Sequence, residues 1–301
     1  MIQTKTPKIM ILGAAGQLGK ELCELAVNFE VAAYDRQALD ITDANAVLQA
    51  VKKERPDCVI NTAAYTAVDK AESDVENAFL INEMGAKNVA QACLAEDVRL
   101  IHISTDYVFN GEKDSAYNEK DQADPQSVYG LSKYKGEQAV RGILPKHIIL
   151  RISWVFGLHG HNFVKSILRL AGEREQLSIV ADQLGNPTAT VNISNVILQI
   201  VSKICAEKFK ENRFGTYHYS DAPETTWFGF ASAIVESARL AGYDDLKVKT
   251  ITPIMTHEYP TPAKRPANSR LSSALIEKNF AIKPAEWRPQ LDALIQELKN
   301  T

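Results

Sequence analysis

A tyrosine and a lysine four positions apart, Tyr129 and Lys133, are the residues whose types and spacing best fit a chemical step. On a helix, positions four apart lie one turn from each other on the same face, so both side chains would share one site. An ammonium group beside a phenol favours the phenolate and lowers the pKa of the phenol. The pair therefore predicts that Tyr129 gives or takes a proton near neutral pH, with Lys133 tuning it.

A glycine-rich loop, GAAGQLG at residues 13–19, follows the apolar run Lys8–Leu12 and precedes a helical pattern. Gly13 would permit the tight turn, Gly16 would let the backbone approach a phosphate, and Gly19 would let the helix pack on the strand. The spacing is GxxGxxG, not the GxGxxG of the general dinucleotide fingerprint, and glycines at such a turn can also serve the turn alone. Its placement between strand and helix favours a pyrophosphate at the helix N-terminus. Together, the loop and the Tyr/Lys pair predict hydride transfer between a nicotinamide and a carbonyl or alcohol.

The end of the second expected strand bears on the choice of cofactor. Asp35 lies about twenty residues after the loop, where a carboxylate can bind ribose hydroxyls. The adjacent Arg36 could instead meet a 2′-phosphate, which leaves NADH and NADPH both open. Asp40 and Ile41 are placed to flank the adenine, although Asp40 could equally be a turn or helix-start residue.

Polar residues end a fourth apolar run and supply candidates for substrate binding. Thr105 is the expected third catalytic member, with Ser104 in support, although hydroxyls at a strand end often only satisfy backbone groups. Trp154 offers a stacking surface for a base or sugar, or is a buried core residue. Arg265, in a proline-rich loop, could bind a phosphate bidentately or stay solvated.

Bulk properties exclude several classes of protein. The 301 residues include 45% hydrophobic and 24% charged residues and carry a formal net charge of −3, so no basic field invites nucleic acid. No apolar run approaches a membrane span, and the N-terminus shows no signal-peptide pattern. Four widely spaced cysteines without CxxC pairs predict reduced thiols, and we expect a cytoplasmic protein. His159 and His161 lack ligand partners at metal spacing, so we expect no metal.

Short apolar runs alternate with helical patterns in the first half, which predicts an α/β fold with a doubly wound parallel sheet of the Rossmann type. We expect a dinucleotide-binding domain over residues 1–156, to which later segments return, and a smaller α/β substrate domain mainly over 157–301. The expected strands cover residues 8–12, 30–34, 58–61, 99–104, 147–152, 177–180, 216–219 and 248–251, and the expected helices cover residues 17–28, 43–54, 75–95, 125–141, 162–172, 193–208 and 227–241.

The chain resembles the dTDP-4-dehydrorhamnose reductase family of the extended short-chain dehydrogenases/reductases. GxxGxxG and YxxxK specify only the superfamily, whereas the other shared motifs are more specific and occur in the same order. They are DxxxLDIT at 35–42, AAYTAVDKAE at 63–72, STDYVFNG at 104–111, YGLSKYKGE at 129–137, RISWVFG at 151–157, NFV at 162–164, DQLGNPT at 182–188 and TPAKRPANSRL at 261–271.

The resemblance implies NADPH- or NADH-dependent reduction of the C4 keto group of dTDP-4-dehydro-β-L-rhamnose, with Tyr129 as proton donor, Lys133 beside it and Thr105 as third member. It implies that the cofactor is lined by Gly13, Gly16, Gln17, Leu18, Gly19, Asp35, Arg36, Asp40, Ile41, Ala63, Ala64, Tyr65, Thr66, Tyr129 and Lys133. It implies that the dTDP-linked 4-keto-6-deoxy sugar meets Ser104, Thr105, Asp106, Trp154, Asn162 and Arg265.

Partners and rival functions follow from the same resemblance. Some members of the family are thought to dimerise through acidic side chains that hold a divalent metal; Glu21 matches one such position, but Val191 stands at another. We therefore expect a monomer or homodimer without metal, nucleic acid or membrane. The alternatives are a non-catalytic nucleotide-binding regulatory subunit, or an enzyme acting on another nucleotide-linked 4-keto sugar, including an epimerase or dehydratase.

Overall fold

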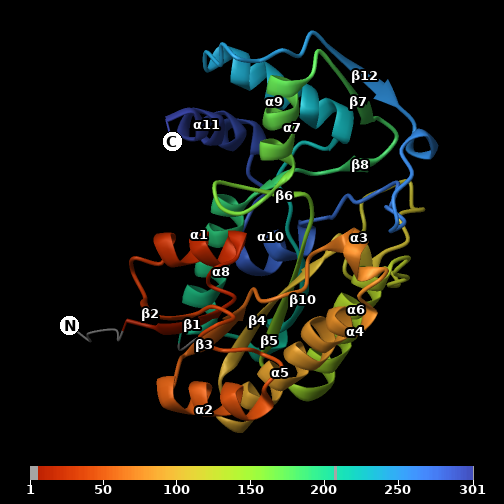
Figure 1. Ribbon diagram of the computed structural model, residues 1–301. Helices are drawn as coiled ribbons and strands as arrows, with labels where there is room; N and C mark the ends of the chain where they lie inside the picture. The colour runs from red at the N-terminus through yellow and green to blue at the C-terminus, as the bar shows by residue number, and fades with distance from the viewer. Residues whose placement is uncertain (1–5, 207–208, 301) are drawn as a thin grey trace.

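A computed structural model describes residues 6–206 and 209–300 (Figure 1). Its main sheet has six parallel strands in the order β10-β5-β4-β3-β1-β2. The strands are β1 (Lys8–Leu12), β2 (Glu30–Tyr34), β3 (Cys58–Asn61), β4 (Arg99–Thr105), β5 (His147–Ile152) and β10 (Gly215–His218). The predicted doubly wound parallel sheet is confirmed, and the order reverses between β1 and β3, where such sheets bind ligands.

Helices cover both faces of this sheet. Apolar side chains of α1 (Gln17–Leu25), α8 (Thr190–Ile204) and α10 (Ala274–Phe280) form one core with the strands. On the other face, α2 (Ala44–Glu54), α5 (Ala86–Ala95) and α6 (Val128–Ile143) form a second core. The inner strands β1, β3, β4 and β5 are almost entirely buried, because a parallel sheet covered on both faces needs no alternation with polar residues.

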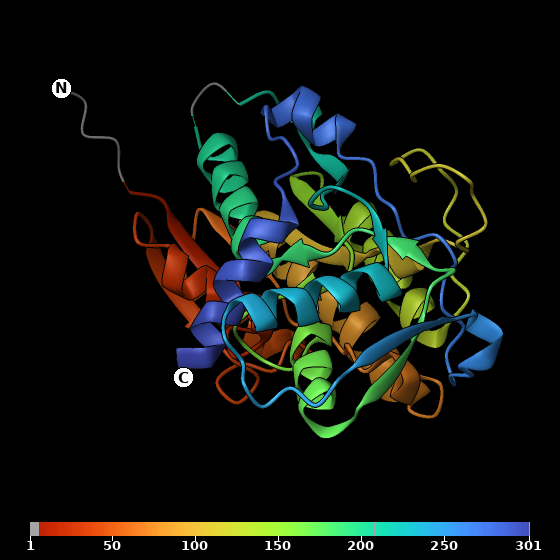
Figure 2. The same cartoon turned by 90° about the horizontal axis from the view of Figure 1, so that it is seen from above.

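A smaller lobe lies above the sheet in Figure 1. It packs α7 (Phe163–Glu173), α9 (Trp227–Leu240) and α11 (Trp287–Asn300) around a third apolar core. Two strands, β7 (Gln176–Val180) and β12 (Thr250–Ile254), pair in parallel in this lobe. Seen from above, α9 lies across the molecule (Figure 2).

Some differences from the sequence expectation are shifts of a few residues, whereas the C-terminal helices α10 and α11 were not expected at all. The helix expected over 193–208 begins at Thr190 and ends at Ile204, and residues 207 and 208 lie outside the described part. The strand expected over 248–251 is β12, which starts two residues later. The helix expected over 75–95 is divided into α4 (Val75–Phe79), a π-helical segment η1 (Leu80–Gly85) and α5. Short elements not expected include α3 (Val68–Ala71), β6 (Val155–Phe156), β8 (Leu184–Gly185), β9 (Thr188–Ala189) and β11 (Thr225–Thr226).

Candidate active site

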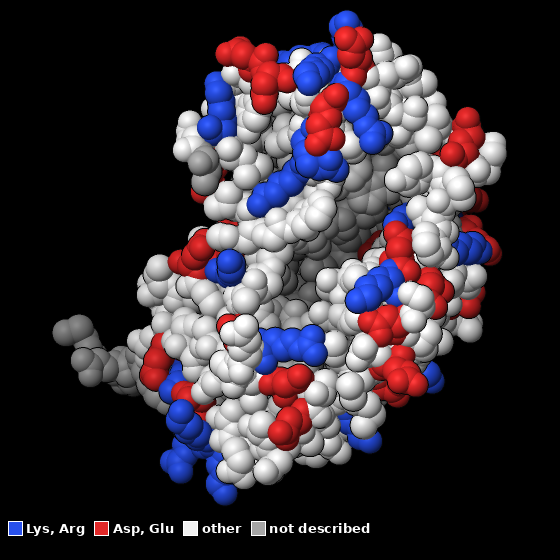
Figure 3. All heavy atoms as spheres, in the orientation of Figure 1, with Lys and Arg blue, Asp and Glu red and all other residues white. Residues whose placement is uncertain are grey.

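A cleft of about 550 Å³ opens at the carboxyl edge of the main sheet. Figure 3 shows this region as a hollow between the two lobes, with charged side chains gathered around its rim. The cleft brings together most of the predicted site residues from loops after five different strands. They are Gly13, Gly16, Gln17, Leu18, Gly19, Arg36, Asp40, Ile41, Ala63, Ala64, Thr66, Ser104, Thr105, Asp106, Tyr129, Lys133 and Trp154.

The glycine loop fits a pyrophosphate at the N-terminus of α1. Gly13 has a φ of 80°, and a Cβ there would lie 2.6 Å from the Ala63 amide nitrogen. A Cβ on Gly19 would lie 2.2 Å from the Gly13 carbonyl oxygen, so the helix can start this close only with glycine. The N-cap residue, Gly16, offers no side chain to the first helical N–H groups, which leaves them for a ligand. The residues present therefore fit a dinucleotide cofactor.

The two candidates for the cofactor ribose differ in position. One carboxylate oxygen of Asp35 accepts hydrogen bonds from the Gln37 and Ala38 amides at 2.9 and 2.8 Å, and Asp35 does not line the cleft. Arg36 does line it, with a side chain 77% exposed and its Nε 3.7 Å from an Asp40 carboxylate oxygen. Hydrogen bonds from Thr42 lower the pKa of Asp40 and fix it at the start of the next turn. An exposed guanidinium at this rim is suited to a 2′-phosphate.

Tyr129 and Lys133 occupy the first turns of α6, as their spacing predicts. The helix begins at Val128 because the Ser127 hydroxyl caps it, accepting from the Gly130 amide at 3.1 Å. Tyr129 is 9% exposed and Lys133 is 3% exposed, so both reach the cleft from the interior. The Lys133 ammonium donates to the Ile103 carbonyl oxygen at 2.6 Å.

The expected lowering of the Tyr129 pKa by Lys133 is not observed. Burial raises the pKa of the Tyr129 phenol above its usual value, opposed by a hydrogen bond with Thr105. Burial also lowers the pKa of Lys133 to about 8, against the nearby Glu137 carboxylate. Desolvation penalises the charged form of each group and is the largest cause of both shifts. Tyr129 is accordingly a neutral phenol that can donate a proton.

A buried ion pair lies one turn of α6 beyond Lys133. The Glu137 carboxylate is fully buried and accepts from the Arg151 guanidinium at 2.8 and 2.6 Å and from the Ser104 hydroxyl at 2.6 Å. Arg141 adds a bond at 3.1 Å. These donors lower the pKa of Glu137 to about 2 despite its burial. Ser104 thus connects the end of β4 to α6.

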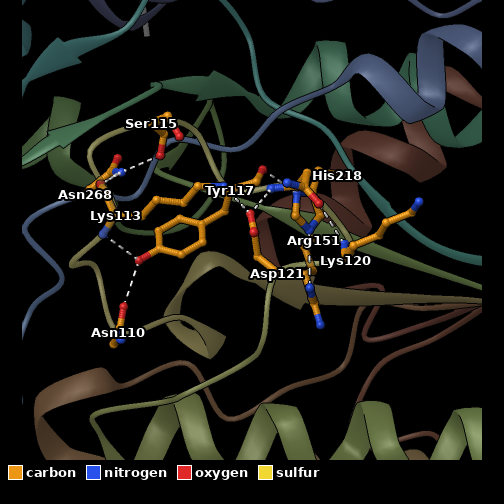
Figure 4. A network of polar contacts seen from close by, with 10 residues as sticks. Asn110, Lys113, Ser115, Tyr117, Lys120, Asp121, Arg151, His218 and Asn268 are labelled. Atoms are coloured by element: carbon orange, nitrogen blue, oxygen red, sulfur yellow. Dashed lines mark hydrogen bonds and ion pairs between the residues drawn. The ribbon is translucent and has the colours of Figure 1, made fainter.

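The pair continues outward into the polar network of Figure 4. The Arg151 Nη1 lies 3.3 Å from His218 Nε2, and His218 Nδ1 lies 3.1 Å from the Tyr117 carbonyl oxygen. The Tyr117 hydroxyl donates to Asn110 at 2.8 Å, and Asn268 donates to the Ser115 carbonyl oxygen at 2.8 Å. The loop from residue 110 to 124 is therefore held against the main sheet and the C-terminal segment.

Trp154 forms the wall of the cleft toward the upper lobe. It has a φ of 46°, which is unusual for a bulky residue, and its ring stacks on Trp227 with centroids 3.5 Å apart. A Cβ on Gly185 would lie 2.3 Å from the Trp154 ring, so glycine is needed there. Trp154 belongs to the buried core of the upper lobe, which was one of the two alternatives, and it also lines the cleft. That it stacks on a base or sugar stays a prediction.

Four predicted site residues do not line the cleft: Asp35, Tyr65, Asn162 and Arg265. The Tyr65 hydroxyl donates to Asp74 at 3.0 Å. Asn162 caps α7 and donates to the Gln17 side chain at 2.8 Å. Arg265 is paired with Asp69 at 2.7 Å.

His159 and His161 have separate surroundings in the described part of the chain. His159 lies 3.0 Å from a Glu24 carboxylate oxygen, and His161 lines the cleft. Within residues 6–206 and 209–300, no group of three or more His, Cys, Asp or Glu is placed to hold a metal ion. All four cysteines are free thiols, as predicted. No described helix is long and apolar enough to span a membrane.

Asn82 is a supporting residue that sequence reasoning missed. It lies in the π-helical segment η1, where its amide donates to the Ser132 hydroxyl at 2.9 Å and to the Tyr65 carbonyl oxygen at 3.0 Å. Its side-chain oxygen accepts from the Tyr65 amide at 2.8 Å. A Cβ on Gly136 would lie 2.1 Å from the Asn82 carbonyl oxygen, so α6 approaches this segment closely. An asparagine within a long apolar helix was the available hint.

A parallel sheet with a glycine loop after its first strand, and a Tyr/Lys helix at its carboxyl edge, defines the class as an extended short-chain dehydrogenase/reductase. The RmlD substrate binding domain model matches residues 7–300. A dTDP-4-dehydrorhamnose reductase of Aggregatibacter actinomycetemcomitans is 42% identical over 287 residues, covering 94% of this chain and 97% of the relative. The chain belongs to the dTDP-4-dehydrorhamnose reductase family.

Solved structures agree with this assignment. A dTDP-4-dehydrorhamnose reductase from Clostridium acetobutylicum has a TM-score of 0.89 and 38% identity, covering 97% of this chain and 99% of the other. The corresponding protein from Bacillus anthracis, solved in complex with NADP, has a TM-score of 0.88 and 37% identity with the same coverage.

Proposed function

We propose that the chain reduces the C4 keto group of dTDP-4-dehydro-β-L-rhamnose to give dTDP-L-rhamnose, using NADPH or NADH. The observation that carries this proposal is the meeting of Thr105, Tyr129 and Lys133 in one cleft. It is supported by relatives of 37–42% identity over nearly the whole chain that are named dTDP-4-dehydrorhamnose reductases.

The reaction needs a hydride at C4 and a proton on the C4 oxygen. When bound, the nicotinamide supplies the hydride. Tyr129 donates the proton, because burial keeps its phenol neutral. Lys133, fixed by the Ile103 carbonyl, places a positive charge below the phenol as the phenolate forms. Thr105 is hydrogen-bonded to Tyr129 and fixes the phenol beside the substrate carbonyl.

Arg36 favours NADPH over NADH in this proposal. Its guanidinium is exposed at the rim of the cleft, whereas Asp35 is engaged by two backbone amides. An exposed guanidinium would attract a 2′-phosphate, while Asp35 accepts hydrogen bonds from its own loop.

The test is NADPH oxidation followed by absorbance, with the keto sugar generated in situ by an upstream dehydratase and epimerase. We expect turnover that requires the epimerase. Tyr129→Phe should reduce kcat by at least about 10³-fold, because the donor proton is lost, while NADPH binding stays near normal. Tyr243→Phe is the matched control, since that hydroxyl donates to the Ile295 carbonyl in the upper lobe.

Three results would redirect the proposal. Undiminished turnover in Tyr129→Phe would refute the mechanism. Turnover without the epimerase would assign the chain to a different 4-keto sugar. Cofactor binding without turnover of either sugar would favour the regulatory subunit.

A further inference from the structure

The Asp106 carboxyl group is buried in the cleft with one oxygen unused. Asp106 follows β4, is 3% exposed and lines the cleft. Its Oδ1 lies 2.9 Å from the Thr105 hydroxyl oxygen. Its Oδ2 has no hydrogen-bond partner among the residues described. An ionised carboxylate with a bare, desolvated oxygen is costly, whereas the carbonyl oxygen of a neutral acid costs much less.

The Thr105 hydroxyl has three possible hydrogen-bond neighbours but only one proton to give. It accepts from the Tyr107 amide at 3.2 Å and is hydrogen-bonded to the Tyr129 hydroxyl. It also contacts Asp106. A hydroxyl group donates once and accepts twice. The protonation of Asp106 therefore decides toward which neighbour the Thr105 proton points.

The two protonation states give opposite orientations at Tyr129. An ionised Asp106 accepts a hydrogen bond from the Thr105 hydroxyl, so Thr105 can only accept a hydrogen bond from Tyr129. The phenolic proton then points toward Thr105 and away from a substrate. A neutral Asp106 donates to Thr105, and Thr105 then donates to the phenolic oxygen. In that arrangement Thr105 uses all three of its positions, and Tyr129 keeps its own proton free.

The surroundings of Asp106 raise the share of its neutral form between pH 5 and 7, although the ionised form is the larger fraction at pH 7. Tyr107 faces the carboxyl from the same turn, Tyr129 from α6, and the Ser269 hydroxyl from the C-terminal segment. The neighbouring cations are engaged elsewhere, Lys133 by the Ile103 carbonyl and Arg265 by Asp69. Burial raises the pKa of Asp106 to about 6, and the neighbouring Ser269 and Thr105 hydroxyl groups oppose this rise.

We propose that Asp106 acts as a neutral carboxylic acid that directs the Thr105 hydroxyl proton onto Tyr129, so that Tyr129 presents its own proton to the substrate. Asp106 is thus a positioning residue that works through Thr105. The inference rests on the proposed reductase function and adds to it a dependence on one carboxyl proton.

The kinetic test compares pH profiles of kcat/KM for the dTDP-linked keto sugar between pH 5.5 and 7.5. With a pKa of about 6, the neutral fraction of Asp106 falls ~25-fold over this interval, and wild-type kcat/KM should fall with it. In Asp106→Asn the amide donates to Thr105 at every pH. Whatever its absolute rate, its kcat/KM should change less than ~2-fold over the same interval. Asp97→Asn, at a surface pair with Lys146, is the matched control and should follow the wild type.

A spectroscopic test needs no turnover. Infrared difference spectra of the protein between pH 5 and 7 should show a carboxylic acid C=O band that disappears with a midpoint near pH 6 and is absent from Asp106→Asn. NADPH binding by fluorescence verifies that each variant is folded.

The outcomes separate this inference from the proposed function. Turnover by the wild type with the same pH slope in Asp106→Asn would overturn the role of Asp106, and so would the absence of the infrared band. An intact band without turnover in the wild type would refute the reductase function while supporting the neutral carboxyl.

Discussion

Replacing Glu137 by Gln removes the anion that neutralises Arg151 in the interior. Both side chains are at least 96% buried, and the two direct bonds between them measure 2.8 and 2.6 Å. Arg151 also contacts His218, whose pKa burial lowers to about 3, and the face of the Phe109 ring, and neither brings a negative charge. The variant therefore leaves a buried guanidinium without a carboxylate in contact, with Glu119 as a more distant anion.

The magnitude follows from two independent routes. Lowering the Glu137 pKa from 4.5 to about 2 corresponds to ~3 kcal/mol of stability at neutral pH. Removing one partner of a buried ion pair typically costs about 3–5 kcal/mol. We therefore expect Glu137→Gln to lower the free energy of unfolding by ~3 kcal/mol at pH 7.

The sign of the pH dependence is fixed by the direction of the shift. A carboxyl with a depressed pKa in the folded state stabilises the protein above its unfolded pKa and loses that contribution as pH falls toward the folded one. The gap between wild type and Glu137→Gln should thus be complete above pH 4.5 and narrow as the pH drops toward 2.

Urea unfolding followed by circular dichroism measures this gap, provided that the m-value is unchanged. Glu173→Gln is the control, because Glu173 forms an exposed pair with Arg169 that contributes about 0.5 kcal/mol or less. A difference between the two variants below ~1 kcal/mol at pH 7, or a gap that does not narrow in acid, would refute the reasoning.

Two further predictions concern Lys133 and Arg36. Lys133→Met should abolish turnover yet stabilise the protein at pH 7 by ~1–3 kcal/mol. The reason is that a lysine whose pKa falls from 10.5 to about 8 on folding opposes folding below pH 8. Urea unfolding at pH 7 measures the change, and a variant less stable than the wild type would contradict the prediction. Arg36→Ala should raise KM for NADPH ~10-fold and leave KM for NADH nearly unchanged, since only the 2′-phosphate contact is lost. Equal effects on both KM values would show that Arg36 does not bind the 2′-phosphate.

The sequence predicts well those features that depend on neighbours along the chain. The strand, the glycine loop and the first helix follow from residues 8–19 alone, and the Tyr129 to Lys133 spacing places both side chains on one helical face. Their motifs are short, so no distant partner has to be known.

Features made by distant partners were out of reach. Asn82 and Ser132 are fifty positions apart, and Trp154 meets Trp227 only because the upper lobe folds back over the sheet. The predicted shift of the Tyr129 pKa was wrong in direction, because the spacing indicates a nearby ammonium group but not how much water is excluded from the phenol. Desolvation depends on the whole packed environment, and no local motif encodes it.

The strand β10 joins the edge of the main sheet only after the chain has passed through α7, β7 and α8. The chain then enters the upper lobe again at α9, returns to the sheet at α10 and leaves for α11. A fragment ending near residue 156 would expose the β5 edge and the face covered by α8, so it should aggregate rather than fold. Proteolysis within the upper lobe should correspondingly release cofactor, because neither lobe can be removed without opening the core of the other. Chimeras of this protein and its relatives are thus expected to fold when single loops are exchanged, and not when a whole lobe is exchanged.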